Sequence, residues 1–263
     1  MTSVRGKVHE AMDRLRVSRS SLFVLAGLAL AACGPLSARP PSGVVIEEHP
    51  LAGPPATDPL TFSPQDGTQA SVLARHAEAR ALGFPETVEI VGPGPEITSI
   101  GESTEWKARL TTSVQTPPEQ VVTVERGGQV VFTAPAGMPS PVLPLPGLWT
   151  YSGHWALELF YGDADVWQGR VFVDGALITT ARGYDEAFSF QLLDGKPFFL
   201  FSRAGGVGYS FDGEEVELGY DQIPHYNCCS ESVLNPVKAQ SMVAFFAQRG
   251  EDWFYVELGQ FEG

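Results

Sequence analysis

The sequence predicts a mainly β protein: an antiparallel meander that forms a sandwich or an open barrel, with one short N-terminal helix. Three observations predict this class. The 263 residues include 28 Gly and 21 Pro, and long helical patterns are scarce among them. Short segments with an apolar period of two recur through the second half of the chain. Asp-Gly pairs, which tolerate the positive φ of tight hairpins, separate several of these segments.

A basic segment and a short apolar run open the chain. Residues 1–21 carry five Lys and Arg, and the eleven apolar residues of 22–32 follow. Eleven residues cover roughly 17 Å as a helix, short of the ~30 Å hydrocarbon core of a bilayer. The pattern is therefore typical of a secretion signal rather than of a permanent membrane span.

The residues around the first cysteine indicate lipidation. Leu30-Ala31-Ala32-Cys33-Gly34 resembles the lipobox of bacterial lipoproteins. That resemblance implies cleavage before Cys33 and a diacylglyceryl group on its thiol, and two acyl chains are what stable anchoring needs. We expect a lipid-anchored protein on the extracytoplasmic side of the cell membrane or the outer membrane.

Charge limits the partners of the exported part. Residues 1–32 hold five basic and two acidic residues, so the remaining 231 residues carry 12 Lys and Arg against 29 Asp and Glu, a net charge of −17. This charge repels phosphate backbones and anionic lipid headgroups. We expect no nucleic-acid partner, and we expect the lipid to be the contact with the membrane.

The sequence suggests five segments. A signal peptide is expected at 1–32, the lipidated cysteine with a Pro-rich tether at 33–65, a helix with a small β-layer at 66–135, a Pro-rich connector at 136–148, and the main β domain at 149–263. The tether is inferred from eight prolines between residues 34 and 64. The helix is expected over Thr68 to Leu82, before Gly83 and Pro85.

Strands are expected in order along the rest of the chain. In the small layer they cover 87–91, 105–112, 121–125 and 129–133, with a hairpin at Arg126-Gly127-Gly128. In the main domain, 215–218 and 254–258 alternate polar and apolar residues. Turns are expected at Asp174-Gly175, Asp194-Gly195 and Asp212-Gly213.

An internal repeat organises the main domain. Val173-Asp-Gly followed by Gly183-Tyr-Asp-Glu matches Phe211-Asp-Gly followed by Gly219-Tyr-Asp-Gln, 38 residues further on. This period occurs in repeated β-meander units, so propeller-like repeat units are the alternative to a sandwich or open barrel. The second copy is followed by a long loop, Ile223 to Gln240, where the first is followed almost at once by a strand.

This loop is the candidate ligand-binding or structural site, because a long excursion in a compact meander usually has a ligand or a structural patch to explain it. It holds His225, Tyr226, Cys228 and Cys229. The adjacent cysteines are a candidate disulfide, although consecutive Cα atoms lie ~3.8 Å apart, closer than in most disulfides. Two buried thiols, or ligation of zinc or copper with His225, are alternatives. We predict no metal and no cofactor.

Aromatic residues offer a second route to binding. Six of them gather in the main domain and are candidates either for sugar stacking or, more often at alternating strand positions, for the core: Trp149, Tyr151, Trp155, Trp167, Tyr184 and Tyr220.

The Gly-Tyr-Asp and His-Tyr-x-Cys-Cys-Ser patterns, with the closing Trp253-Phe-Tyr-Val-Glu-Leu-Gly259, resemble a group of uncharacterised bacterial envelope proteins over residues 149–262. The resemblance implies no particular activity. No Gly-x-Ser-x-Gly motif is present and the histidines are scattered, so we identify no catalytic residue. We expect a binding or scaffolding module for an envelope protein or glycan; the alternative is an envelope hydrolase or thiol redox protein that uses the same loop.

Overall fold

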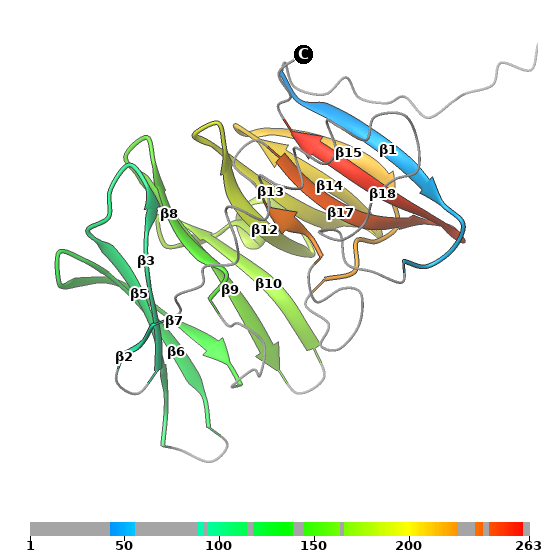
Figure 1. Ribbon diagram of the computed structural model, residues 1–263. Helices are drawn as coiled ribbons and strands as arrows, with labels where there is room; N and C mark the ends of the chain where they lie inside the picture. Colours follow the sequence, from blue (N-terminus) through cyan, green and yellow to red (C-terminus); the bar gives the residue numbers. More distant parts are fainter. Residues whose placement is uncertain are drawn as a thin grey trace, which may run out of the picture. The chain divides into compact units, whose positions relative to one another are not determined.

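The computed structural model describes residues 43–55, 89–91, 94–114, 118–138, 145–163, 166–225, 235–238 and 242–259. These residues form three β-sheets, with antiparallel pairing almost throughout (Figure 1). The predicted mainly β, sandwich-like class is confirmed. Within the described part of the chain, no helix is long and apolar enough to cross a membrane. The predicted helix at 68–82 lies outside the described residues, as does Cys33.

The largest sheet collects the ten strands that follow one another from residue 89 to residue 177, and so includes the start of the predicted main domain. Its central path is β11-β10-β9-β7-β6-β5-β3-β2, and β8 joins it by pairing with β9 and β4. The strands are β2 (Glu89–Val91), β3 (Gly94–Thr98), β4 (Ile100–Gly101), β5 (Trp106–Thr112), β6 (Gln120–Arg126), β7 (Gln129–Gly137), β8 (Gly147–Tyr151), β9 (His154–Asp163), β10 (Val166–Val173) and β11 (Ala176–Leu177).

Alternation of side chains explains why these segments form strands. In β6, Val122 and Val124 are fully buried, whereas the intervening residues are only half-buried. A period of two places every second residue on the face that packs on the core. The predicted hairpin between β6 and β7 is confirmed, and Gly127 and Gly128 both have positive φ there.

The Pro-rich stretch after residue 134 does not break the sheet where we expected. Strand β7 continues to Gly137, and Pro135 lies next to a register shift against β6, where a missing N–H is tolerated. Gly137 then pairs in parallel with Gly162 of β9. The predicted connector at 136–148 therefore includes the end of β7 and the start of β8, and strands on both sides of it belong to one sheet. Its role as a domain boundary stays a prediction.

Ion pairs between β3 and β5 give the stability of this sheet a pH dependence. The Glu96 carboxylate accepts hydrogen bonds from Lys107 Nζ at 2.8 Å and Arg109 Nε at 2.9 Å. These two bonds, that of Lys107 first, hold the pKa of Glu96 below its usual value although burial opposes them. A carboxyl group whose pKa is lowered by folding stabilises the folded state above its unfolded pKa, and that stability is lost as the pH falls through the folded pKa.

Glu96→Gln is therefore expected to lower the free energy of unfolding at pH 7, by about 1 kcal/mol or less because Lys107 and Arg109 are largely exposed. Urea unfolding of both proteins at pH 7 and at successively lower pH measures this. The difference should shrink below about pH 4.3, the usual unfolded pKa of Glu. A difference that stays constant down to pH 2 contradicts the assignment.

The second sheet is a four-stranded antiparallel meander that follows the first sheet in the chain. A short helix, α2 (Ile178–Arg182), leads into it. Its strands are β12 (Glu186–Leu193), β13 (Lys196–Arg203), β14 (Gly206–Phe211) and β15 (Glu214–Tyr220). The turns predicted at Asp194-Gly195 and Asp212-Gly213 lie between its strands and have positive φ at both residues, as does the turn at Asp174-Gly175 before it.

The third sheet joins the two ends of the described chain. Its order is β1 (Val45–Leu51), β18 (Asp252–Gly259), β17 (Met242–Arg249) and β16 (Val237–Lys238). Figure 1 shows β1 lying along β18, and all seven residues of β1 pair with it, from Val45 opposite Gly259 to Leu51 opposite Trp253.

Strand β1 corrects one expectation. The interpretation of the whole of 33–65 as a tether is wrong for residues 44–51, because the β-branched Val44, Val45 and Ile46 favour a strand. Val44 is 4% exposed and belongs to the core. Pro50 does not prevent this, because β1 has only one paired neighbour, β18, among the described strands, and an edge strand tolerates proline.

Both faces of the second sheet are covered. One face packs on the third sheet through a core that includes Phe198, Tyr209, Phe245 and Val256. The opposite face packs on β8, β9, β10 and α2 through a second cluster that includes Phe190. Burial of these large side chains, at about 25 cal/mol per Å² of apolar area, is the main stabilising contribution.

The internal repeat has a structural counterpart. Gly183 and Gly219 both adopt φ of 72°, a left-handed conformation that glycine permits. The following tyrosines are buried and donate to carboxylates: Tyr184 Oη to Glu215 at 2.7 Å, and Tyr220 Oη to Glu48. The next residues also match, because Asp185 accepts from the Ala204 N–H in the β13–β14 turn and Asp221 from the Gly250 N–H in the β17–β18 turn. Each repeat therefore fixes a hairpin turn.

Candidate functional site

The candidate loop leaves β15 at the edge of the second sheet and returns at β16 in the third. The structure describes its two ends, Ile223–His225 and 235–238. Of the predicted site residues, His225 is described, whereas Tyr226, Cys228 and Cys229 lie outside the described residues. The proposed disulfide therefore stays a prediction, and the geometry concerns the ends that hold the segment 226–234.

His225 fixes the first end against β12. Its ring stacks on Phe188 with centroids 3.6 Å apart and planes 5° apart. Nε2 lies 3.0 Å from Glu186 Oε1 and Nδ1 lies 2.5 Å from the Ile223 carbonyl oxygen. A carbonyl oxygen can only accept, so Nδ1 carries a hydrogen. Both ring nitrogens face protein oxygens, which disfavours His225 as a metal ligand shared with the cysteines.

Glu186 of β12 contacts both the start of the loop and strand β10. Besides facing His225, its Oε1 accepts a hydrogen bond from the Gly169 N–H of β10 at 2.5 Å. Both Glu186 and His225 are largely shielded, with side chains 17% and 14% exposed. Water competes less for a shielded hydrogen bond than for an exposed one, so this contact restrains the start of the loop more strongly.

Asn235 fixes the second end. Its Nδ2 donates to the Pro224 carbonyl at 2.6 Å and to the Phe246 carbonyl at 3.0 Å, and its Oδ1 accepts from the Phe246 N–H at 2.8 Å. The side chain is buried and pairs with β17 as a neighbouring strand would. Pro224 and Asn235, which flank the segment that carries both cysteines, are thus joined by a direct hydrogen bond.

A buried carboxylate lies beside the returning end of the loop. Glu158 of β9 is completely buried and contacts Lys238 Nζ of β16 at 2.7 Å. It also accepts hydrogen bonds from the backbone N–H groups of Ser189 at 2.5 Å and Phe190 at 3.1 Å. Ser189 has a φ of 56° inside an irregularity of β12, where the pairing with β13 shifts.

Glu158 therefore compensates for a break in β12. The two N–H groups that it accepts lie in the irregular part of the strand, and a buried N–H without an acceptor is costly. Lys238 neutralises the carboxylate and also donates to the Phe190 carbonyl at 3.0 Å. One charged pair thus connects strands of all three sheets, β9, β12 and β16. The sequence gives no local signal for this pair, because 80 residues separate its members.

Most of the aromatic residues considered for sugar stacking belong to the core. Trp149, Tyr151, Trp155, Tyr184 and Tyr220 are all buried. Burial, followed by the charge of Asp174, raises the pKa of Tyr151 to about 12, so its hydroxyl is neutral at ordinary pH. Trp167 is 37% exposed and stacks on Phe160 with centroids 5.1 Å apart. Of the six, Trp167 is therefore the one that can offer a ring to a ligand.

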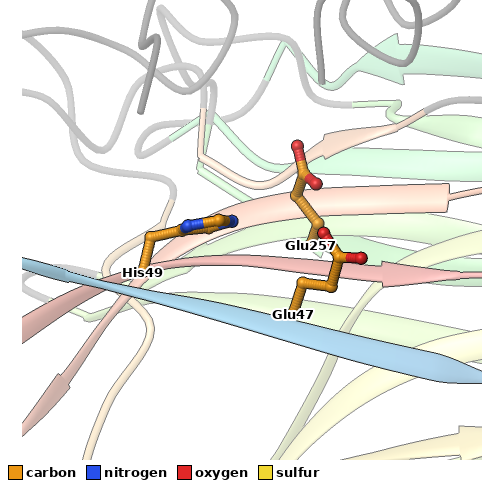
Figure 2. Close-up of side chains that lie close together, drawn as sticks. All are labelled: Glu47, His49 and Glu257. Carbon is orange, nitrogen blue, oxygen red and sulfur yellow. The ribbon is translucent and has the colours of Figure 1, made fainter. Parts of the chain in front are cut away.

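A second group of chemically capable side chains lies on strands β1 and β18 of the third sheet. Glu47 and His49 of β1 and Glu257 of β18 offer ligand atoms that all lie within 4.8 Å of one another, and Figure 2 shows the three side chains directed toward a common space. The Glu-x-His spacing in β1 was a usable signal, because residues i and i+2 share one face of a strand. It was missed because His49 was assigned to the tether.

The chain matches no known protein family, and no curated protein is similar to it. The functional argument therefore depends on the residues and their geometry.

Proposed function

We propose that the chain is an extracytoplasmic, lipid-anchored protein that acts as a binding or scaffolding module and presents the 223–240 loop to an envelope protein or glycan. The anchor is supported by the basic N-terminal segment, the short apolar run and the Leu-Ala-Ala-Cys33 motif. The net charge of −17 for residues 33–263 supports attachment through the lipid rather than through anionic headgroups.

One observation carries the binding role: both ends of the segment 226–234 are fixed by side-chain contacts to separate strands. His225 is held by Phe188 and Glu186, and Asn235 bonds to Pro224 and Phe246. Recognition loops are commonly held by a rigid scaffold, since a restrained loop loses less conformational entropy when it binds. The arrangement suits presentation of the segment to a partner.

Strand β1 shortens the expected distance between lipid and domain. Ten residues, 34–43, lie between Cys33 and the buried Val44. At ~3.5 Å per residue a fully extended chain spans at most about 40 Å over this stretch. A partner would then lie close to the membrane that holds the lipid, rather than up to ~90 Å from it as a thirty-residue tether allows.

Replacement of Cys33 tests the anchor. When the chain is expressed in a bacterium that processes lipoproteins, the native protein should incorporate labelled fatty acid and enter the detergent phase. Cys33→Ser should abolish the label and leave the protein in the aqueous phase, because the acceptor thiol is gone. The matched control, Cys228→Ser with Cys229→Ser, should behave as the native protein does. Labelling that survives Cys33→Ser contradicts the anchor.

Replacement of the segment 226–234 by nine Gly and Ser residues tests the binding role, with purified peptidoglycan sacculi as the probe. The variant keeps His225 and Asn235, so its melting temperature should stay close to the native one, while its cosedimentation with sacculi should fall to background. Equal cosedimentation of both proteins contradicts a glycan role for the loop. Rapid reduction of a Cys228–Cys229 bond, seen by mass measurement with and without reductant, would favour a thiol redox protein instead.

A further inference from the structure

We propose that Glu47, His49 and Glu257 form a zinc site that joins strand β1 to strand β18. The residues of the site belong to strands β1 and β18, and the argument for them does not depend on the proposed anchor or binding role. It uses two residues from one strand and one from the other.

The register of the two strands creates the site. Glu47 lies opposite Glu257 and His49 lies opposite Tyr255 in the antiparallel pairing. Directly opposed residues have Cβ atoms about 4.5–5.5 Å apart and point to the same face. Their ligand atoms are within 4.8 Å of one another (Figure 2). Tetrahedral zinc with ~2.1 Å bonds places its ligand atoms about 3.4 Å apart, so the side chains would have to move closer together by about 1 Å to bind it.

Charge favours a cation in this space. Glu257 is completely buried, and like charges directly opposite each other on two strands are destabilising. The Tyr255 hydroxyl donates a hydrogen bond to Glu257 Oε1 at 2.9 Å. This bond orients the carboxylate. A bound divalent ion would stabilise both carboxylates at once.

The imidazole supplies an independent observation. His49 Nε2 is inaccessible to solvent and has no hydrogen-bond partner among the described residues. Buried polar atoms without a partner are uncommon because the lost hydration is not replaced. The ring also lies 5.8 Å from that of Tyr255, centroid to centroid, which limits its orientation. Coordination of a metal would satisfy this nitrogen.

The ligand types select the ion. One imidazole nitrogen and two carboxylate oxygens are ordinary ligands of Zn²⁺. Zinc commonly binds three protein ligands and one water molecule in a tetrahedral site. Calcium and magnesium prefer oxygen ligands alone and more of them. The ion would connect the first and last strands of the described chain, so we infer a stabilising role for it.

Zinc retention by the full chain, purified in a non-ionic detergent, tests the proposal. The protein is treated with chelator, loaded with Zn²⁺, desalted and analysed for metal. We expect one zinc per chain, and a melting temperature that rises by roughly 5–10 °C when free zinc is a hundred times the dissociation constant. Calcium at the same concentration should give neither effect.

Two substitutions locate the ion. His49→Gln and Glu257→Gln should each weaken zinc binding by at least about a hundredfold, more than the loss of a residue that only orients a ligand. Two controls should retain zinc: His154→Gln, which alters an exposed histidine beside Asp174, and Cys228→Ala with Cys229→Ala. Circular dichroism checks that each variant is folded.

The visible absorption spectrum of the cobalt-substituted native protein tests the ligand types without any variant. Co²⁺ bound by nitrogen and oxygen ligands should show weak visible bands and no thiolate-to-cobalt charge-transfer band. No retained zinc in the native protein, zinc retained by a His49→Gln, Glu257→Gln double variant, or a strong thiolate band would each overturn the proposal.

Discussion

Glu158→Ala is expected to lower the free energy of unfolding by about 3–5 kcal/mol, the usual cost of removing one member of a buried ion pair. Glu158 is completely buried, and its loss removes the partner of Lys238 and the acceptor for the N–H groups of Ser189 and Phe190. Each buried N–H left without an acceptor costs about 1–3 kcal/mol. Urea unfolding at pH 7 measures the change.

Two controls separate burial from charge. Glu105→Ala removes an exposed carboxylate that pairs with Arg126 and should cost about 1 kcal/mol or less. Glu158→Gln keeps an acceptor oxygen and should fall between Glu105→Ala and Glu158→Ala. If Glu158→Ala costs no more than Glu105→Ala, the carboxylate does not hold the three sheets together as the contacts imply.

Gly137→Ala should be the second large effect, a loss of at least about 3 kcal/mol or a failure to fold. Gly137 has a φ of 77°, and a Cβ there would lie 2.0 Å from the carbonyl oxygen of Gly162. Alanine at positive φ costs about 1–2 kcal/mol by itself. The clash is with backbone rather than with a movable side chain, so the β7–β9 pairing must open to relieve it.

Gly213→Ala is the matched control for this substitution. Gly213 has a φ of 85°, but nothing lies within 4 Å of the added Cβ. Gly213→Ala should therefore lower the free energy of unfolding only by the cost of placing alanine at positive φ, about 1–2 kcal/mol. Thermal unfolding of both variants gives the difference, and equal melting temperatures would show that the junction between β7 and β9 tolerates separation.

Local patterns predicted the strands and turns well. Alternation in 121–125 and the glycines that follow correspond to β6 and its hairpin, and the Asp-Gly pairs have the predicted positive φ. These features depend on neighbours in the sequence, which a single chain displays. Strand β1 was missed because proline content was averaged over thirty residues, whereas three β-branched residues at 44–46 decide the local structure.

Long-range contacts explain what the sequence did not reveal about the sites. His225 was predicted as a site residue, but its contact with Glu186 depends on how β12 approaches the loop. Glu158 and Lys238 are 80 residues apart, and Glu47 and Glu257 are 210 apart. No periodicity or motif connects residues at such separations, because their contact is a property of sheet order. The adjacent cysteines, which only the sequence singles out, stay a prediction.

The pairing of β1 with β18 has a consequence for biogenesis. Pairing of strands that are far apart in the sequence is slow, because the entropy of loop closure is lost before the stabilising contacts between the strands form. In a chain that crosses a membrane N-terminus first, β1 would emerge early and stay unpaired, with Val44 uncovered, until residues 252–259 follow. Truncated or stalled chains would keep this apolar edge accessible, which marks them for aggregation or proteolysis. In such a chain, the third sheet would be complete only after residues up to Gly259 had crossed the membrane.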